Sequence, residues 1–226
     1  MQKSKAVIIV AGGKGLRMNS DIPKQFIPIN GFPVLMHTIR AFQNFNNKIQ
    51  IIVVLPENQM SYWAGLCKKY AFDVKHEIAP GGETRFHSVK NGLKLINMPA
   101  IVAVHDGVRP FVSNNTIIKC FDAAEEYGTV IPVVDAVDSI RQITPHGNLS
   151  VDRNLYKMVQ TPQVFDGELL LRAYEQTFSP LFTDDASVVE SLGHKITLVE
   201  GNRENIKLTT AIDLEWAKII SKRFNE

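Results

Sequence analysis

The sequence predicts an α/β fold in which a mostly parallel sheet is flanked by helices and carries a projecting β-arm. Short apolar runs of strand length alternate with amphipathic stretches of helix length along most of the 226 residues. The runs are apolar at nearly every position, as strands covered on both faces must be. One strand and one helix together take roughly 20 to 30 residues, the spacing of crossovers between parallel strands.

The first part of the chain follows this alternation closely. Buried strands are expected at residues 6–11, 49–55, 101–104 and 129–134. Helices are expected at residues 34–45, 59–70, 84–96 and 114–126. Ser113 or Asn114 can cap the last of these helices, and Gly128 ends it.

The pattern changes at about residue 135. Residues 135–152 are polar, and the β-prone stretches 139–144 and 149–151 flank a turn-rich segment. This indicates a β-hairpin that projects from the sheet. Because a projecting arm cannot bury its own face, we infer that a partner subunit covers it. We therefore expect a single domain at 1–226 with a dimerisation β-arm at about 135–155.

The α/β pattern then resumes without a linker of disordered composition or an internal repeat. Helices are expected at about residues 167–178, 185–191 and 211–223, and a strand at 195–199.

Composition excludes several classes of protein. The 25 basic and 23 acidic residues give a net charge of +2. This near-balance lacks the excess of positive charge that is typical of a nucleic-acid-binding protein. The apolar run at 6–11 is too short for a signal peptide, and no stretch approaches the length of a membrane span. Cys67 and Cys120 lie far apart and suggest neither a disulfide framework nor a metal site. A reduced, cytoplasmic setting is expected.

The turn after the first predicted strand is the first candidate site. It reads Ala-Gly-Gly-Lys-Gly at residues 11–15, and successive backbone N–H groups in such a turn can bind an anion. An ordinary tight turn is the alternative. The motif is not a Walker A loop, and Met18 stands where a dinucleotide-binding fingerprint needs a glycine. Arg17 and Lys24 add the positive charge that phosphoryl or nucleotidyl transfer requires.

Two later loops also carry candidate residues. The paired glycines at 81–82 precede a predicted helix, where the loop backbone and Ser88 could read a base edge or simply form a helix cap. Asp106 follows the third predicted strand, at the sheet edge where open α/β folds bind ligands. It could hold a ribose hydroxyl or a divalent metal, and Arg109 a phosphate, or the two could form a salt bridge. His105 is expected to be structural.

Taken together, these motifs resemble those of the 2-C-methyl-D-erythritol 4-phosphate cytidylyltransferases, in order and over essentially the whole chain. They lie at residues 11–18, 23–25, 81–89, 105–110, 151–153, 161–165, 183–187 and 205–209. The first motif is shared by many nucleotidyltransferases, whereas the later ones in combination are highly specific.

The resemblance implies a Rossmann-like nucleotidyltransferase fold whose β-arm interlocks with its partner in a homodimer. It implies an enzyme that condenses CTP with methylerythritol phosphate, giving the CDP-alcohol and pyrophosphate in non-mevalonate isoprenoid biosynthesis. Mg²⁺, or another divalent cation, would bridge the triphosphate oxygens.

The resemblance also assigns roles by position. Arg17 and Lys24 match transition-state stabilisers, and Arg153 and Lys207 match groups that orient the incoming phosphate. The implied CTP site comprises Ala11, Gly12, Gly13, Gly15, Lys24, Gly82, Glu83, Ser88, Asp106 and Gly107, with Asp106 also on the metal side. The implied site for the alcohol phosphate comprises Arg109, Ser139, Arg153, Thr161 and Lys207. Ser139 and Arg153 lie on the predicted arm, so the dimer would deliver them across the subunit interface.

Three other functions compete with this interpretation. A ribitol 5-phosphate cytidylyltransferase would share the CTP half of the site, although Thr-Asp-Asp-Ala-Ser at 183–187 looks more like the methylerythritol enzyme. The missing third glycine disfavours an NAD-dependent oxidoreductase. A catalytically silent nucleotide-binding regulator would be expected to lack one of the four assigned cations, and all four are present.

Overall fold

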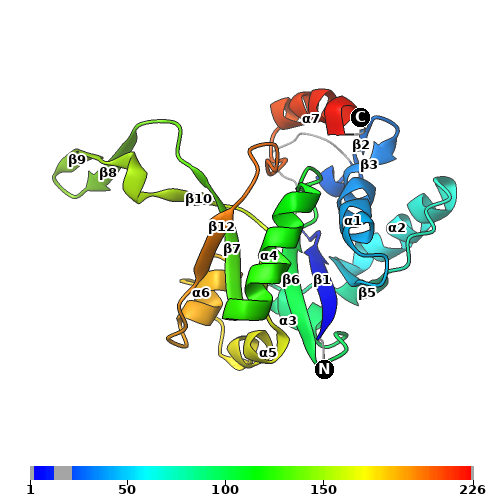
Figure 1. Cartoon of the computed structure of the whole chain (residues 1–226). Helices are drawn as coiled ribbons and strands as arrows, with labels where there is room; N and C mark the ends of the chain where they lie inside the picture. Colours follow the sequence, from blue (N-terminus) through cyan, green and yellow to red (C-terminus); the bar gives the residue numbers. More distant parts are fainter. Residues whose placement is uncertain (1–2, 13–21, 225–226) are drawn as a thin grey trace.

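Eight strands form the central sheet in the described part of the chain, residues 3–12 and 22–224 of this computed structural model. Across the sheet they follow the order β10-β7-β11-β6-β1-β4-β5, and β12 pairs with β7 (Figure 1). Their bounds are β1 (Ser4–Val10), β4 (Gln50–Leu55), β5 (Glu77–Pro80), β6 (Ala100–Asp106), β7 (Thr129–Asp135), β10 (Lys157–Val159), β11 (Gln163–Asp166) and β12 (Thr197–Glu200).

Most of this sheet is parallel, which confirms the predicted fold class. β1 pairs in parallel with β4 and β6, β4 with β5, and β12 with β7. By contrast, β11 lies antiparallel between β6 and β7, and β10 runs antiparallel to β7. β5, β10 and β11 are not among the expected strands. Each is short, and polar residues or a proline at its ends interrupt the apolar pattern.

Helices cover both faces of the sheet and create two cores. Val7 and Ile9 of β1 face one core, whereas Ala6 and Ile8 face the other, because successive strand residues point in opposite directions. α1, α2 and α4 contribute to the first core, and α3, α5 and α6 to the second. The helices are α1 (Val34–Phe45), α2 (Glu57–Lys69), α3 (Arg85–Leu93), α4 (Asn114–Tyr127), α5 (Gly167–Glu175), α6 (Asp185–Glu190) and α7 (Ala211–Phe224).

α4 shows how the local sequence sets the bounds of a helix. The Ser113 side chain accepts a hydrogen bond from the backbone N–H of Thr116, so Ser113 is the N-cap. Gly128 ends the helix with a φ of 77°. Cys120, in the middle of α4, is buried in the first core, and burial raises the pKa of its thiol to about 12. Cys67 on α2 is only partly buried.

A third, smaller core connects the carboxyl-terminal part of the chain to the edge of the sheet where β1 and β6 end. α7 contributes Ala217 to it, and the short strands β2 (Pro28–Ile29) and β3 (Phe32–Pro33) form a hairpin that contributes Ile29. Val108 and Leu208 complete the contact, and the backbone N–H of Leu208 donates to the carbonyl of Val108 at 2.9 Å. This packing fixes the position of the neighbouring Lys207.

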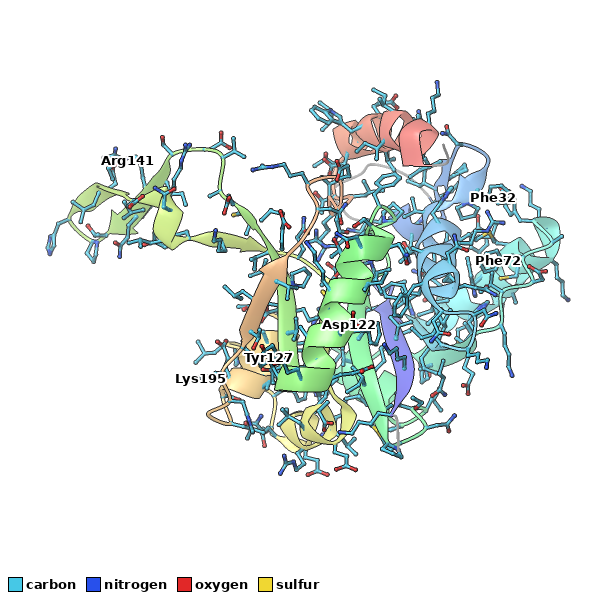
Figure 2. The ribbon with its side chains drawn as sticks, viewed as in Figure 1. Phe32, Phe72, Asp122, Tyr127, Arg141 and Lys195 are labelled. Carbon is cyan, nitrogen blue, oxygen red and sulfur yellow. The ribbon has the colours of Figure 1, made fainter. Side chains whose placement is uncertain are left out.

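The predicted hairpin is present and extends from the body of the molecule at the left of Figure 1. β8 (Ile140–Thr144) and β9 (Gly147–Val151) pair antiparallel, and the short 3₁₀ helix η2 (Arg153–Leu155) follows them. Side chains along this arm, Arg141 among them, lie away from the body (Figure 2). Ile143 and Leu155 are 79% and 80% exposed. No helix in the described residues is long and apolar enough to span a membrane.

Candidate active site

A pocket of about 300 Å³ opens where β1 and β6 end. Its walls come from the ends of β1 and β6, the 3₁₀ helix η1 (Lys24–Phe26), the start of α3 with its preceding loop, and the segment before α7. The lining residues are Val10, Ala11, Gly12, Lys24, Gln25, Gly82, Glu83, Thr84, Arg85, Ser88, Asp106, Val108 and Lys207.

Most of the predicted CTP residues therefore meet in one pocket. Gly107 lies directly behind it, since its N–H donates to the carbonyl of Val10 at 2.9 Å. The loops after β1 and β6 approach so closely that a Cβ atom on Gly107 would lie 2.8 Å from the Cβ atom of Ala11. Gly13, Gly15 and Arg17 lie outside the described residues.

The loop before α3 is shaped by a second close approach. A Cβ atom on Gly82 would lie 2.4 Å from the Cβ atom of His87, a separation that side chains do not tolerate. The N–H of Gly82 donates to Ser88 Oγ at 3.0 Å, and this hydroxyl donates to the carbonyl of Thr84 at 2.9 Å. Ser88 therefore holds the glycine loop against the start of the helix.

Asp106 is the acidic centre of the pocket. It is 7% exposed, and both Lys207 Nζ and Arg109 Nε lie 3.1 Å from its Oδ2. Arg85 Nε lies 3.9 Å from its Oδ1. Burial alone would raise the pKa of this carboxyl, but the charges of these three cations outweigh it and hold the pKa well below its ordinary value. Asp106 is therefore ionised at neutral pH.

Lys24 and Lys207 are the cations best placed to meet a ligand in this pocket. Lys24 is half-buried at the start of η1, where the adjacent Gln25 is anchored by a hydrogen bond from its Nε2 to Gln59 Oε1 at 2.7 Å. The Lys207 side chain is 44% exposed. Positive charge thus lines a pocket that the backbone of Gly12 and Gly82 also borders.

Arg109 and Thr161 are instead engaged beneath Asp106. Arg109 is largely buried and also donates to the carbonyl of Asn205 at 2.7 Å. The Thr161 hydroxyl accepts the N–H of Asp106 at 3.1 Å and lies 3.0 Å from His105 Nδ1, to which it donates because the neutral ring carries its proton on Nε2. Nε2 of His105 then donates to the carbonyl of Arg109 at 3.0 Å.

His105 is therefore a structural group, as expected from the sequence. It is fully buried, and burial lowers its pKa to about 4, so the ring is neutral at pH 7. In this structure, Arg109 and Thr161 stabilise the loops that hold Asp106.

The two predicted arm residues do not reach the pocket of their own chain. Ser139 and Arg153 are exposed on the arm, which extends away from the body (Figure 1). The Arg153 guanidinium donates to the carbonyl of Val137, also on the arm. A site that used these residues would need the arm of another subunit.

Arg85 lines the pocket as well, although the sequence analysis assigned it no individual role. It donates two hydrogen bonds to Asp185, 100 residues further along the chain. A signal was present, because Arg85 occupies the first turn of a helix, where the helix dipole disfavours a cation unless an acid compensates it. The sequence could not identify that acid.

The pocket also suits a divalent cation bound together with phosphates. Among the described residues, no three His, Cys, Asp or Glu side chains cluster to form a metal site. Mg²⁺ is commonly held by one or two carboxylates together with substrate phosphates. Asp106 fits that requirement, since it is ionised and its Oδ1 lies beyond hydrogen-bonding distance of Arg85.

Comparisons with known proteins identify the family of this chain. The family model of 2-C-methyl-D-erythritol 4-phosphate cytidylyltransferase (IspD) matches residues 5–223. A protein of that name from Bacteroides fragilis is 59% identical over 216 residues, covering 96% of this chain and 99% of the relative. One from Porphyromonas gingivalis strain W83 is 49% identical, covering 97% of this chain and 99% of the relative.

Solved structures give the same result. 4-Diphosphocytidyl-2C-methyl-D-erythritol synthase from Anaerococcus prevotii superposes with a TM-score of 0.83 and 29% identity, covering 98% of this chain and 97% of that one. The cytidylyltransferase from Thermus thermophilus gives a TM-score of 0.79 and 28% identity, covering 98% and 100%. From the matched residues, the identities and the shared fold, this chain belongs to the 2-C-methyl-D-erythritol 4-phosphate cytidylyltransferase family.

Proposed function

We propose that the pocket around Asp106 is where this chain transfers CMP from CTP to 2-C-methyl-D-erythritol 4-phosphate. The reaction gives 4-diphosphocytidyl-2-C-methyl-D-erythritol and pyrophosphate, a step in isoprenoid precursor synthesis. The observation that carries the proposal is the set of cations around one buried carboxylate, beside a glycine-rich wall at the ends of parallel strands. Such an arrangement suits a nucleoside triphosphate.

The chemistry is an in-line displacement at phosphorus. A phosphate oxygen of methylerythritol phosphate forms a bond to the α-phosphorus of CTP, and the bond from that phosphorus to the bridging oxygen breaks. Pyrophosphate leaves with the electron pair of that bond. Because the attacking phosphate is already ionised, no side chain has to remove a proton, so positioning and neutralisation of charge account for most of the catalysis.

The positively charged side chains have different roles in this reaction. Lys24, with Arg17, neutralises the charge that develops on the α-phosphate and the leaving pyrophosphate. Lys207 and Arg153 orient the incoming phosphate. Arg109, Ser139 and Thr161 complete the proposed site for the alcohol phosphate, although Arg109 and Thr161 would contribute chiefly by holding Asp106 and its loop in place.

The nucleotide is held mainly by the backbone. Ala11, Gly12, Gly13 and Gly15 follow β1 and form the proposed cradle for the triphosphate. Gly82, Glu83 and Ser88 border the proposed cytosine site, and Asp106 and Gly107 the ribose. Mg²⁺ held at Asp106 would supply further neutralisation of phosphate charge.

The working form is proposed to be a homodimer joined through the arms. Several apolar side chains on the arm are exposed, among them Ile143, Leu149 and Leu155. An exposed apolar surface of this kind is typical of an interaction site. In the dimer, Ser139 and Arg153 would complete the pocket of the partner subunit. The free cysteines Cys67 and Cys120 support a reduced, cytoplasmic setting.

The deciding experiment measures pyrophosphate release with CTP and Mg²⁺, comparing methylerythritol phosphate with ribitol 5-phosphate as the acceptor. Release with methylerythritol phosphate alone is expected. Release with ribitol phosphate alone would retain the CTP half of the site and reassign the acceptor to the competing activity. No release with either would contradict the proposed reaction.

A further inference from the structure

A largely buried series of polar groups, called the polar chain below, leads from the second core to the wall of the pocket. It begins at Tyr174 on α5, continues through Asp185 on α6 and Arg85 on α3, and ends at Asp106. Three separate sequence motifs, at 81–89, 161–165 and 183–187, contribute to it or support it.

Next to Tyr174, the polar chain contains the closely paired carboxylate of Asp185. Arg85 Nη1 and Nη2 donate to the two oxygens of Asp185 at 2.8 and 2.6 Å, which is the bidentate geometry that arginine favours. The Tyr174 hydroxyl donates to the same carboxylate at 2.6 Å. The side chain of Asp185 is completely buried, so these partners replace water as its donors.

The outer end of the polar chain, formed by Arg85 and Asp106, faces the nucleotide pocket. With both Nη atoms engaged by Asp185, Arg85 directs its Nε toward Asp106 Oδ1, at 3.9 Å. Burial would lower the pKa of Arg85, but the neighbouring carboxylates outweigh burial and raise it, so the guanidinium stays charged. Arg85 therefore supplies a fixed positive charge, since turning toward a phosphate would break its pair with Asp185.

The position of Asp185 is itself well determined. Asp184 and Ser187 form a capping box at the start of α6. Gln163 of β11 donates from Nε2 to Asp184 Oδ2 at 2.8 Å and accepts the N–H of Ala186 at 2.9 Å. Since Gln163 pairs with Val104 in β6, the strand that ends at Asp106, the start of α6 and Asp106 are both attached to the same strand.

We propose that Asp185 and Tyr174 are positioning residues of the nucleotide site, which fix the charge of Arg85 beside the Asp106 carboxylate and so support CTP binding. This inference rests on the proposed function, because it requires that Asp106 contributes to CTP binding. Neither Asp185 nor Tyr174 lines the pocket, so both act at a distance.

The first test removes one hydroxyl. Tyr174→Phe leaves the ring stacked on Phe86, whose centroid lies 4.7 Å away, and deletes only the hydrogen bond to Asp185. The dissociation constant for CTP, measured by calorimetry, and the KM for CTP are expected to rise about three- to tenfold. The KM for methylerythritol phosphate is expected to stay unchanged. Tyr127→Phe is the matched control, because Tyr127 is exposed at the far end of α4 (Figure 2).

Asp185→Asn tests the charge of the buried pair and is expected to weaken CTP binding more than Tyr174→Phe does. Val189→Ala, a buried change on the same helix, is its control for lost packing. If Val189→Ala weakens CTP binding to the same extent at an equal loss of thermal stability, the role of Asp185 is merely structural and the proposal fails. Should Asp185→Asn not fold, Tyr174→Phe alone decides.

A double-mutant cycle then tests the positioning role separately from the proposed function of the pocket. Asp106→Asn alone is expected to weaken CTP binding, and adding Tyr174→Phe to it is expected to cost little more. If Tyr174→Phe has its full effect in the Asp106→Asn background, the positioning role is wrong while the proposed function stands. If Asp106→Asn alone leaves CTP binding unchanged, the assignment of Asp106 to the nucleotide site fails as well.

Discussion

The pocket and the arm differ in how much of their surroundings a single chain provides. In the pocket, Asp106 is 7% exposed and contacts cations from three separate segments of its own chain. On the arm, Leu149 and Leu155 are 59% and 80% exposed, and Arg153 bonds only to a neighbouring carbonyl among the contacts described. One chain thus fixes the pocket that is proposed to bind the nucleotide, whereas the arm carries exposed surface that is proposed to meet a second chain.

The largest expected effect comes from the pocket itself. Lys24→Ala is expected to lower kcat about 100-fold or more, because a charge that stabilises the leaving pyrophosphate is lost. Lys24 is only half-buried, so the thermal midpoint of unfolding should barely change. Steady-state pyrophosphate release and thermal melts measure the two quantities. Lys48→Ala, at an exposed position after α1, is the control, and near-normal turnover of Lys24→Ala would contradict its role.

The second prediction tests whether the arm serves the partner. Arg153→Ala and Lys24→Ala are each expected to be inactive as homodimers. Mixed, refolded and paired at random, they should regain about a quarter of wild-type activity, since each heterodimer holds one complete site. Mixing at equal amounts and assaying turnover is the measurement. If mixing restores nothing while heterodimers form, Arg153 acts within its own chain or not at all.

Acid is expected to destabilise the body of the protein through His105. The pKa of His105 is about 4 in the folded protein and about 6.5 in the unfolded chain, so between these values the unfolded chain binds the extra proton. Stability is therefore fully present above about pH 6.5 and falls by about 3 kcal/mol as the pH drops to about 4.

Urea unfolding from pH 7 to 4.5 measures the slope of the unfolding free energy against pH. His105→Gln should flatten it, whereas His146→Gln, at an exposed position on the arm, should leave it unchanged. Equal slopes in all three proteins would show that His105 does not govern the acid response.

The smallest expected effect is on the glycine loop. Gly82→Ala is expected to destabilise the protein by about 1–3 kcal/mol and to raise the KM for CTP, because its methyl group would collide with His87. Gly65→Ala, in α2 with open space around it, should be neutral or slightly stabilising. Thermal melts and CTP titrations compare them. A neutral Gly82→Ala would show that the loop relaxes.

The sequence predicted those features whose cause is local. Continuous Val and Ile residues indicated β1, β4, β6 and β7, and turn residues indicated the arm. β11 was missed because its first residue, Gln163, is polar and yet buried, and its partners Asp184 and Ala186 lie elsewhere in the chain. Such burial depends on contacts that no local pattern contains.

In the candidate site, too, the features with a local cause could be predicted and those that depend on distant contacts could not. Glycines and cations indicated the lining around Ala11, Lys24 and Asp106, which the structure brings together. The bidentate pair between Arg85 and Asp185 could not be predicted, because the two residues are 100 positions apart and each has an ordinary role in a helix turn. The roles of the site residues in binding and catalysis stay predictions.

The buried thiol of Cys120 offers a way to observe the first core from outside. Its raised pKa and complete burial should make it inert to maleimides in the native state, whereas Cys67 on α2 is only partly buried and is expected to react first. Once Cys67 has been blocked or replaced, any labelling of Cys120 requires α4 to separate from the sheet. The rate of that reaction would report how often this face of the enzyme opens.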